Sequence, residues 1–315
     1  MADDGLGGTG PGMRVQMGND MPATQTGRVS VSAIRADDVD EVAAFLHVHL
    51  DSAISAAEWS AAIIPPWSAE RPDHGFQLRA EGRLVGVYVA YYSPKRALDS
   101  GSVRFCNLAA WTVLEGYRSQ GVLLLMALLK QRGLAFTDLT ADRPEVVQMD
   151  RRLGFLELDT TAYLAINVPG IARGVRVVTG AREVAEVLGA KARQEYLDHA
   201  GIPGLEHLAL VGDGRGCHVA YRVRTVPLRR LGGRSLTVAR MLHVSDPALY
   251  RQGRGAVARH LLVRGIPLSW AEERMTGPRP RLAREDTILA SHRLYRGEGL
   301  SDDDIDYLYS EAMFV

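Results

Sequence analysis

The residues best suited to binding chemistry stand in the stretch 113–133, which reads VLEGYRSQGVLLLMALLKQRG. A polar turn here runs directly into helix formers, and four turn residues precede the helix: Arg118, Ser119, Gln120 and Gly121. The first N–H groups of a helix have no partner within it and carry partial positive charge. Because glycine lets another group approach the backbone, such turns hold phosphate. A helix that merely begins at a glycine is the alternative.

The other candidate ligands do not form a metal site. His47 and His49 lie two positions apart, whereas neighbours on one helix face are three or four apart. Zinc sites combine Cys and His at short spacings, but the chain has only two cysteines, Cys106 and Cys217. We therefore expect no bound metal.

Length and composition indicate a globular protein of two domains. The chain has 315 residues, of which 46% are hydrophobic and 23% charged, which is too long for one small core and ordinary in composition. Two cysteines suggest a reducing compartment, so we expect a cytoplasmic protein. No apolar run reaches membrane-spanning length, so we expect no membrane partner. Residues 1–27 lack the apolar core of a secretory signal and predict a disordered tail.

The net charge of zero hides an uneven pattern. Residues 212–284 contain fifteen arginines and four acidic residues, whereas residues 285–315 contain eight acidic residues and two arginines. Only three lysines occur, and arginine grips phosphates with two parallel N–H bonds. The basic segment 212–284 therefore suits a polyanionic ligand or a nucleic acid such as tRNA. Solvated surface arginine is the alternative.

Two halves of the chain repeat one order of elements. The segments VSVSAIRADDVDEVAAFL and VRVVTGAREVAEVLGAKA each predict a strand, a turn and an amphipathic helix. The segments GRLVGVYVAYY (82–92) and DGRGCHVAYRVR (213–224) each predict a hairpin strand beside a turn, at Glu81-Gly82 and at Asp213-Gly214.

The repeat continues to the end of each half. The strands RFCNLAAWTV (104–113) and SLTVARMLHV (235–244) each precede a glycine-containing turn and a helix. After a further short strand, each half is expected to close with a helix and a glycine, at VVQMDRRLGF (146–155) and SHRLYRGEGL (291–300). The offset is about 145 residues at both ends of the repeat.

The repeat predicts a boundary at Val168-Pro169-Gly170. It gives two domains, residues 28–168 and 169–315, after the tail. Each domain is expected to be an α/β (α+β) unit, with a mixed twisted sheet flanked by helices.

The order of elements and the turn YRSQGV resemble the Gcn5-related N-acetyltransferase superfamily. The pyrophosphate loop of that family reads Arg or Gln, two variable residues, Gly, one variable residue, then Gly or Ala, after a strand that usually ends in valine. Here Val113 ends the strand, while Arg118, Gln120 and Gly121 fill the loop. Leu123 stands where the family prefers Gly or Ala, and RRLGF (151–155) matches the last helix of the family.

The resemblance implies a tandem pair of acetyltransferase-like domains that use acetyl-CoA or another acyl-CoA. Backbone N–H groups from Gln120 through Val122 to Leu123 would hold the pyrophosphate. A splay beside the strand 110–113 would take the pantetheine arm.

In the second half, Gln252 and Gly255 fit the same loop, and Val257 replaces the Gly or Ala. A bulky side chain at the last position restricts the approach of phosphate to the backbone. One half is therefore a structural remnant, or both halves hold a modified donor.

The resemblance also suggests catalytic residues. The tyrosine that protonates the leaving thiolate in the family corresponds to Tyr295 in the second half and to Asp150 in the first. A phenol with a pKa of about 10 suits this role, whereas Asp150 serves only if its surroundings raise its pKa. His243, on the strand before the second loop, has a suitable pKa for a base. Trp59 and Trp67 lie where the family builds its acceptor wall. For each of these residues, packing or solvation is the alternative role.

We expect an acyl-CoA-dependent N-acyltransferase that transfers an acetyl or other acyl group to a small amine, such as an amino sugar or a natural-product intermediate. The alternative is an aminoacyl-tRNA-dependent transferase of related fold, as in the Fem family, because affinity for nucleic acid scales with the phosphates neutralised. No coiled-coil insertion of the Fem type is present, and the Arg118 turn resembles the CoA loop. A non-catalytic acyl-CoA-binding protein is the second alternative, favoured by Leu123, Val257 and Asp150.

Overall fold

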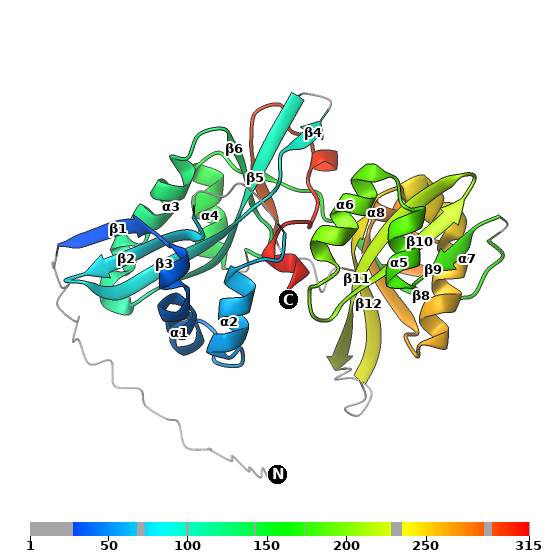
Figure 1. Ribbon diagram of the computed structural model, residues 1–315, viewed down its shortest axis with the longest axis horizontal. Helices are drawn as coiled ribbons and strands as arrows, with labels where there is room; N and C mark the ends of the chain where they lie inside the picture. The colour runs from blue at the N-terminus through cyan, green and yellow to red at the C-terminus, as the bar shows by residue number, and fades with distance from the viewer. Residues whose placement is uncertain are drawn as a thin grey trace, which may run out of the picture.

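The computed structural model describes residues 28–67, 73–98, 101–141, 143–172, 174–227, 235–286 and 292–314. The predicted N-terminal tail, residues 1–27, lies outside these ranges. Two separate mixed sheets, each flanked by helices, make up the two halves, and the C-terminus lies between them (Figure 1). The predicted fold class is thus confirmed.

The first sheet has eight strands, with the spatial order β1-β2-β3-β5-β6-β15-β7 and with β4 paired to β5. Within it, β5 and β6 run parallel, and the other pairs are antiparallel. The strands are β1 (Val29–Ala33), β2 (Gly75–Ala80), β3 (Arg83–Tyr92), β4 (Arg96–Leu98), β5 (Gly101–Val113), β6 (Leu134–Asp138), β7 (Leu156–Glu157) and β15 (Leu294–Arg296).

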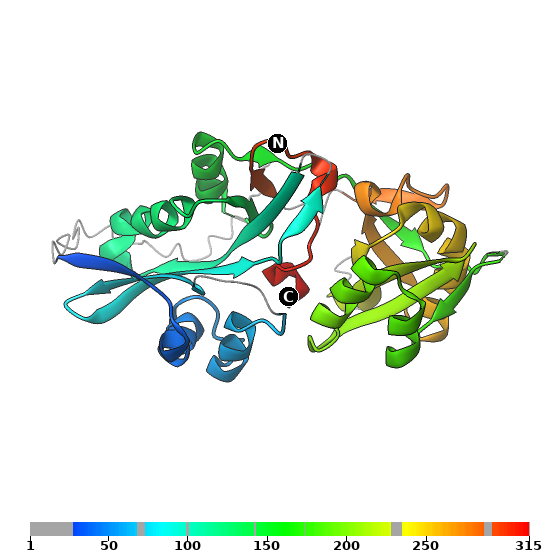
Figure 2. The same ribbon diagram turned by 45° about the horizontal axis from the view of Figure 1, so that its top comes forward.

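Two pairs of helices cover opposite faces of the first sheet (Figure 2). One face carries α1 (Val39–His49) and α2 (Ala56–Ile63), and the other carries α3 (Val122–Leu129) and α4 (Pro144–Arg152). Alternation along β3 explains this division, because successive side chains of a strand point to opposite faces. Val87 and Val89 belong to the core under α1, whereas Tyr88 and Ala90 belong to the core under α3.

The second sheet has seven strands in the order β14-β8-β13-β12-β11-β10-β9. Its strands are β8 (Ala162–Ile166), β9 (Arg176–Val178), β10 (Leu205–Gly212), β11 (Arg215–Pro227), β12 (Ser235–Val244), β13 (Leu268–Glu272) and β14 (Ala283–Asp286). Its helices are α5 (Ala181–Val187), α6 (Ala190–His199), α7 (Pro247–Val263) and α8 (Glu273–Thr276). The parallel pair here is β12 with β13, which matches β5 with β6 in the first half.

The two halves exchange one strand. β8 follows β7 along the chain but lies in the second sheet, antiparallel to β13 and β14. β15, near the C-terminus, lies in the first sheet, antiparallel to β6 and β7. The segment 292–314 therefore joins the first half in space, whereas the sequence assigns it to the second domain across a boundary near residue 168.

The hairpin turns are confirmed. Glu81 and Gly82 have φ angles of 51° and 83°, and Asp213 and Gly214 have φ angles of 51° and 71°. Both central residues of a type I′ turn need positive φ, which Gly adopts freely and Asp tolerates. These turns join β2 to β3 and β10 to β11, as the sequence predicts.

Two local predictions are wrong. The helix predicted over residues 291–300 is strand β15 in its described part, because β6 and β7 pair with its backbone on both sides. The turn predicted at residues 252–257 is the middle of helix α7. That helix begins at Pro247, and Asp246 caps it by accepting a hydrogen bond from the Leu249 N–H at 2.9 Å.

Candidate active site

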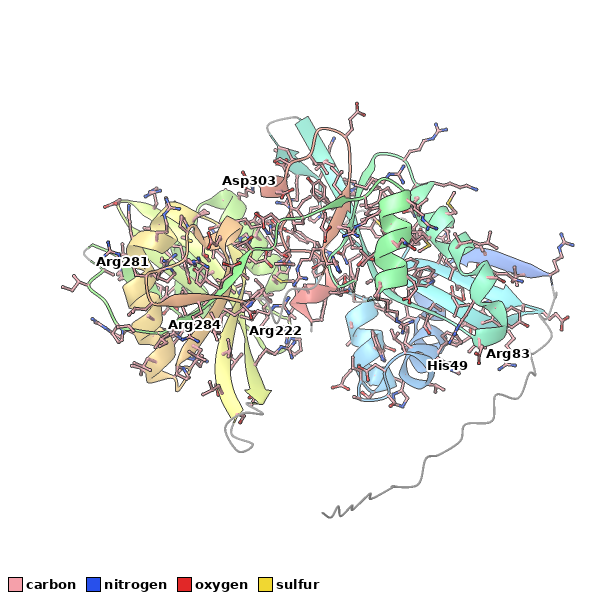
Figure 3. All side chains as sticks on the ribbon, turned by 180° about the vertical axis from the view of Figure 1, so that it is seen from behind. His49, Arg83, Arg222, Arg281, Arg284 and Asp303 are labelled. Atoms are coloured by element: carbon pink, nitrogen blue, oxygen red, sulfur yellow. The ribbon has the colours of Figure 1, made fainter. Side chains whose placement is uncertain are left out.

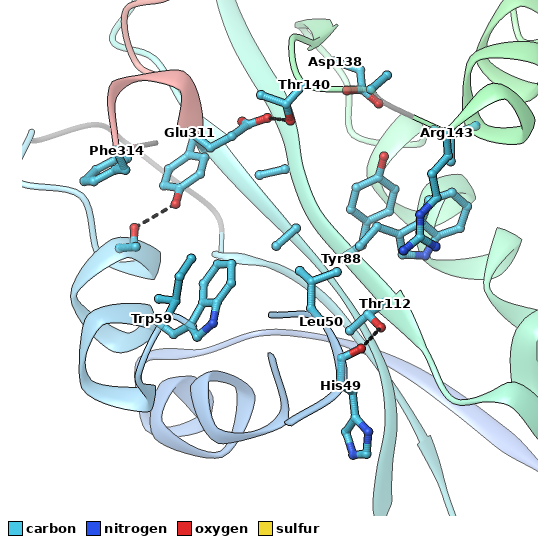
Figure 4. A pocket seen from close by; sticks show the side chains of 18 of the residues that line it. His49, Leu50, Trp59, Tyr88, Thr112, Asp138, Thr140, Arg143, Glu311 and Phe314 are labelled. Atoms are coloured by element: carbon cyan, nitrogen blue, oxygen red, sulfur yellow. Dashed lines mark hydrogen bonds between the residues drawn. The ribbon is translucent and has the colours of Figure 1, made fainter. Parts of the chain in front are cut away.

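A cavity of about 960 Å³ lies in the first half beside β5 (Figure 4). Its walls come from β5, the segment between α1 and α2, the start of α4 and the C-terminal segment. The second half contributes Pro203 and Arg222, and Figure 3 shows Arg222 at the junction of the two halves. The first half thus builds this cavity, and the second half closes one side of it.

The cavity occupies a splay between β5 and β6. The two strands pair in parallel only as far as Leu108 opposite Asp138, whereas β5 continues to pair with β3 as far as Val113. Tyr88 pairs with Trp111, but Ala90 pairs with Leu108, so a bulge lies between these pairs. An unpaired strand edge presents N–H and C=O groups. The stretch 109–113 can therefore bind an extended, amide-containing chain.

One end of the cavity reaches the start of α3. The 3-10 helix η2 (Glu115–Gln120) carries Arg118, Ser119 and Gln120, and Gly121 is the N-cap of α3. Of the predicted loop residues, Val113 and Arg118 line the cavity. A Cβ on Gly121 would lie 3.1 Å from the Val113 side chain and 3.2 Å from the Arg118 carbonyl oxygen, so a larger residue would displace the loop. The Gly121 N–H donates to the Arg118 carbonyl oxygen at 3.1 Å, so the helix dipole and the Arg118 guanidinium are the features here that suit an anion.

The first side chains of α3 do not enter the cavity. Val122 and Leu123 are 41% and 42% exposed, and neither side chain lines the cavity. Leu123 stands where the family prefers Gly or Ala, yet its side chain is directed to solvent and not into the cavity.

In the described part of the second half, the residues that match this loop in sequence do not form one. Gln252 is exposed and Gly255 lies inside α7, where backbone N–H groups bond to carbonyls one turn earlier. A Cβ on Gly255 would lie 2.7 Å from the Gly170 Cα, so the segment between the halves covers this position. Val257 is buried in the core. The prediction that Gln252 and Gly255 form a pyrophosphate loop is therefore wrong.

A carboxyl group from the C-terminal segment also lines the cavity. Glu311 begins the 3-10 helix η5 (Glu311–Met313) and accepts hydrogen bonds from the Asn107 amide and the Thr140 hydroxyl. Burial raises the pKa of Glu311 to about 7. A group with this pKa can accept a proton at neutral pH and release it again.

Two further carboxyl groups interact with each other: Asp138 ends β6, and Asp150 lies on α4. Asp138 lines the cavity, and burial together with the charges of Asp150 and Glu311 raises its pKa well above the ordinary value. Asp150 is fully buried, and burial raises its pKa too. An interaction with the Asp138 side chain acts in the opposite direction and lowers the pKa of Asp150. Since like charges disfavour double ionisation, this pair holds a proton more readily than two separate carboxyl groups would.

Tyr295 and His243 lie elsewhere, and neither lines the cavity. Tyr295 is on β15, where its hydroxyl donates to Asp302 at 2.8 Å. Burial raises the pKa of Tyr295 to about 12. His243 is buried on β12 with its ring 5.3 Å from that of His218, and its Nε2 lies 3.5 Å from a Glu195 carboxylate oxygen. The structure thus brings Asp150 near the cavity and leaves Tyr295 and His243 in packed surroundings.

The two candidate tryptophans occupy different environments. Trp59, on α2, lines the cavity. Trp67 is 2% exposed, and its Nε1 donates to the Tyr92 carbonyl oxygen at 3.0 Å. Trp67 is therefore a core residue.

Sequence reasoning missed two important cavity residues. Asp138 could have been found from its position, because ligand sites gather at the carboxyl ends of parallel strands. Glu311 had no local signal, since it meets Asn107 across 204 residues of sequence.

Metal and membrane features are not found in the described ranges. No group of three or more His, Cys, Asp or Glu side chains there could hold a metal ion. Within the same ranges, no helix combines the length and the apolar character needed to cross a bilayer.

Known proteins resemble this chain in structure and not in sequence. No protein-family model and no curated protein sequence matches it. A GCN5-related N-acetyltransferase from Anabaena variabilis ATCC 29413 has 10% identity and a TM-score of 0.56, over 85% of this chain and 72% of that one. One from Kribbella flavida has 13% identity and a TM-score of 0.54, over 88% and 73%. A GCN5-related glucosamine N-acetyltransferase region of a fungal multi-domain β-N-acetylglucosaminidase has 14% identity and a TM-score of 0.52, over 86% and 38%. The chain has the fold of the GCN5-related N-acetyltransferases.

Proposed function

We propose that the first half is an acyl-CoA-dependent N-acyltransferase that acts on the amine of a small molecule. The observation that carries this proposal is the position of Glu311. Its carboxyl group lines the cavity where β5 and β6 separate, and burial raises its pKa to about 7. The helix start at Gly121 suits the pyrophosphate of the donor. The free edge of β5 suits its amide-containing arm, and the cavity volume suits a small acceptor.

The cavity residues supply both a base and an acid for this reaction. Glu311 accepts a proton from the bound ammonium, which frees the nitrogen lone pair. The nitrogen attacks the thioester carbonyl, a C–N bond forms and the C–S bond breaks. The departing thiolate takes a proton from the protonated Asp138–Asp150 pair, and this pair regains one from the nitrogen as the amide forms. The products are an amide, free CoA and one proton, which Glu311 passes to water.

An aminoacyl-tRNA donor finds less support. Within the basic segment 212–284, several arginines are engaged inside the protein. Arg222 donates to the Met313 carbonyl oxygen, Arg274 pairs with Glu272, and Arg254 donates to the Thr276 carbonyl oxygen. Residues 228–234 of this segment lie outside the described ranges.

Calorimetry of the purified chain with acetyl-CoA, longer acyl-CoAs and total tRNA tests the donor. We expect an acyl-CoA to bind and tRNA not to bind. The second-half variant Gln252→Ala is the matched control for the first-half variant Gly121→Asp, and it should bind the donor like the wild type. Mass spectrometry of an amine mixture after incubation then separates an enzyme from a non-catalytic acyl-CoA-binding protein, because only the enzyme adds an acyl mass.

A further inference from the structure

The part of the cavity beside Glu311, where the proposed amine acceptor would lie, has a different lining from the part beside the start of α3. We infer that it takes a primary ammonium carried on an apolar, ring-bearing body, such as an arylalkylamine, and not a polyhydroxylated amino sugar. This inference rests on the proposed function and names the acceptor class of that site.

Aromatic rings from three distant segments line this part of the cavity. They are Trp59 of α2, Tyr91 of β3 and Phe314 of the C-terminal segment. The rings of Tyr91 and Phe314 stack, with centroids 5.6 Å apart and planes 20° apart. Figure 4 shows Trp59 and Phe314 on the same side of the cavity as Glu311. Aliphatic side chains complete the wall: Leu50, Ile54, Ala61, Ala62 and Pro203. An apolar body gains free energy in proportion to the area it buries here.

Three polar side chains of this wall already have partners within the protein. The Tyr91 hydroxyl donates to the Ala62 carbonyl oxygen at 2.9 Å. The Arg222 Nε donates to the Met313 carbonyl oxygen at 2.9 Å, and the Thr140 hydroxyl donates to Glu311. Sugar hydroxyls that face the aromatic and aliphatic part of this wall lose water without gaining hydrogen bonds there, which costs free energy. The wall therefore disfavours an amino sugar.

The charge of the wall suits a cation. Glu311 and Glu58 both line the cavity, and hydrogen bonds from Ser55 lower the pKa of the exposed Glu58. An ammonium beside Glu311 gains an ion pair, and the aromatic faces add a cation–π attraction. Because the cation must lie beside Glu311 for its proton to be removed, the apolar body extends toward Trp59 and Phe314.

The test compares two primary amines of similar size, phenethylamine and glucosamine, with the full chain and saturating acetyl-CoA. Free CoA is measured with a thiol reagent. We expect kcat/KM for phenethylamine to be at least tenfold higher. The variant Trp59→Ala should raise KM for phenethylamine at least fivefold and leave kcat and acetyl-CoA affinity within twofold. The control Val48→Ala, at an exposed residue of α1 that does not line the cavity, should stay near the wild type.

The outcomes separate this inference from the proposed function. If calorimetry detects no acyl-CoA binding, the proposed function fails and the inference fails with it. If acetyl-CoA binds but glucosamine is the better substrate, or neither amine reacts, the acceptor class is overturned and donor use stands. If Trp59→Ala raises KM equally for both amines, the inferred acceptor class is also overturned, because a general loss of packing gives an equal effect.

Discussion

The change Glu311→Gln should stabilise the fold above neutral pH and abolish most of the activity. The folded pKa of Glu311 is raised from 4.5 to about 7. Because the folded protein binds this proton more tightly than the unfolded chain does, protonation of Glu311 stabilises the fold. This stabilisation is fully present below pH 4.5 and is lost as the pH rises through about 7. A pKa difference of this size corresponds to about 3 kcal/mol.

The variant Glu311→Gln avoids this loss of unfolding free energy at high pH, but it gives up part of the advantage through a lost hydrogen bond. Glu311 accepts hydrogen bonds from Asn107 and Thr140, and a glutamine amide has only one acceptor oxygen. Loss of one such bond costs about 1 kcal/mol. We therefore expect Glu311→Gln to exceed the wild type by about 2 kcal/mol at about pH 8, and to show no advantage at about pH 5.

Activity should change in the opposite direction. Removal of a general base lowers turnover by roughly 10²–10⁴. In the wild type, kcat/KM should rise about tenfold per pH unit up to about pH 7 and then level, because free Glu311 must be ionised. The variant should lose this inflection.

The assays are urea unfolding at two pH values and a kcat/KM profile against pH. The control is Glu298→Gln, an exposed carboxylate of the same C-terminal segment, which should match the wild type in both. A variant less stable than the wild type at about pH 8, or one that keeps the inflection in its rate, would refute the role of Glu311.

Further predictions follow from the same site. Gly121→Asp places a carboxylate and a Cβ at the donor anion site, so calorimetry should show acyl-CoA affinity at least tenfold weaker, about 1.4 kcal/mol; unchanged affinity in a folded variant would move the donor elsewhere. Tyr295→Phe should keep wild-type turnover and lose about 1 kcal/mol of unfolding free energy, because its hydroxyl bonds Asp302 outside the cavity; a large loss of turnover at an unchanged melting temperature would instead make Tyr295 catalytic. Arg222→Leu should lower kcat and leave acyl-CoA affinity unchanged, because Arg222 holds the Met313 carbonyl oxygen two residues from Glu311; unchanged kcat would show that the C-terminal segment keeps its place without this contact.

Local sequence determined the parts of the fold that depend on neighbouring residues. The turns at Glu81-Gly82 and Asp213-Gly214 follow from side chains that tolerate positive φ. The strand, turn and helix around Gly121 follow from alternation, a polar turn and helix formers. The repeat of these elements was enough to predict two mixed sheets.

Other predictions failed where local patterns are ambiguous. SHRLYRGEGL resembles a closing helix, yet partners on both sides make Leu294–Arg296 a strand. Residues 252–257 resemble a loop because they contain two glycines, but the cap at Asp246 starts the helix earlier. In both places, backbone hydrogen bonds outweighed propensity, since each buried polar group needs a partner.

Tertiary structure alone decided which side chains share the cavity. The exchange of β8 and β15 brings the end of the chain back to the first half and sets Glu311 against Asn107 and Thr140. Neither the pKa of Glu311 nor the enclosure of Asp138 is present in the sequence, because burial produces both. The sequence thus predicted a polar turn and a helix start at Gly121, and the fold decided, through contacts between residues far apart in the chain, which carboxyl groups line the cavity beside them.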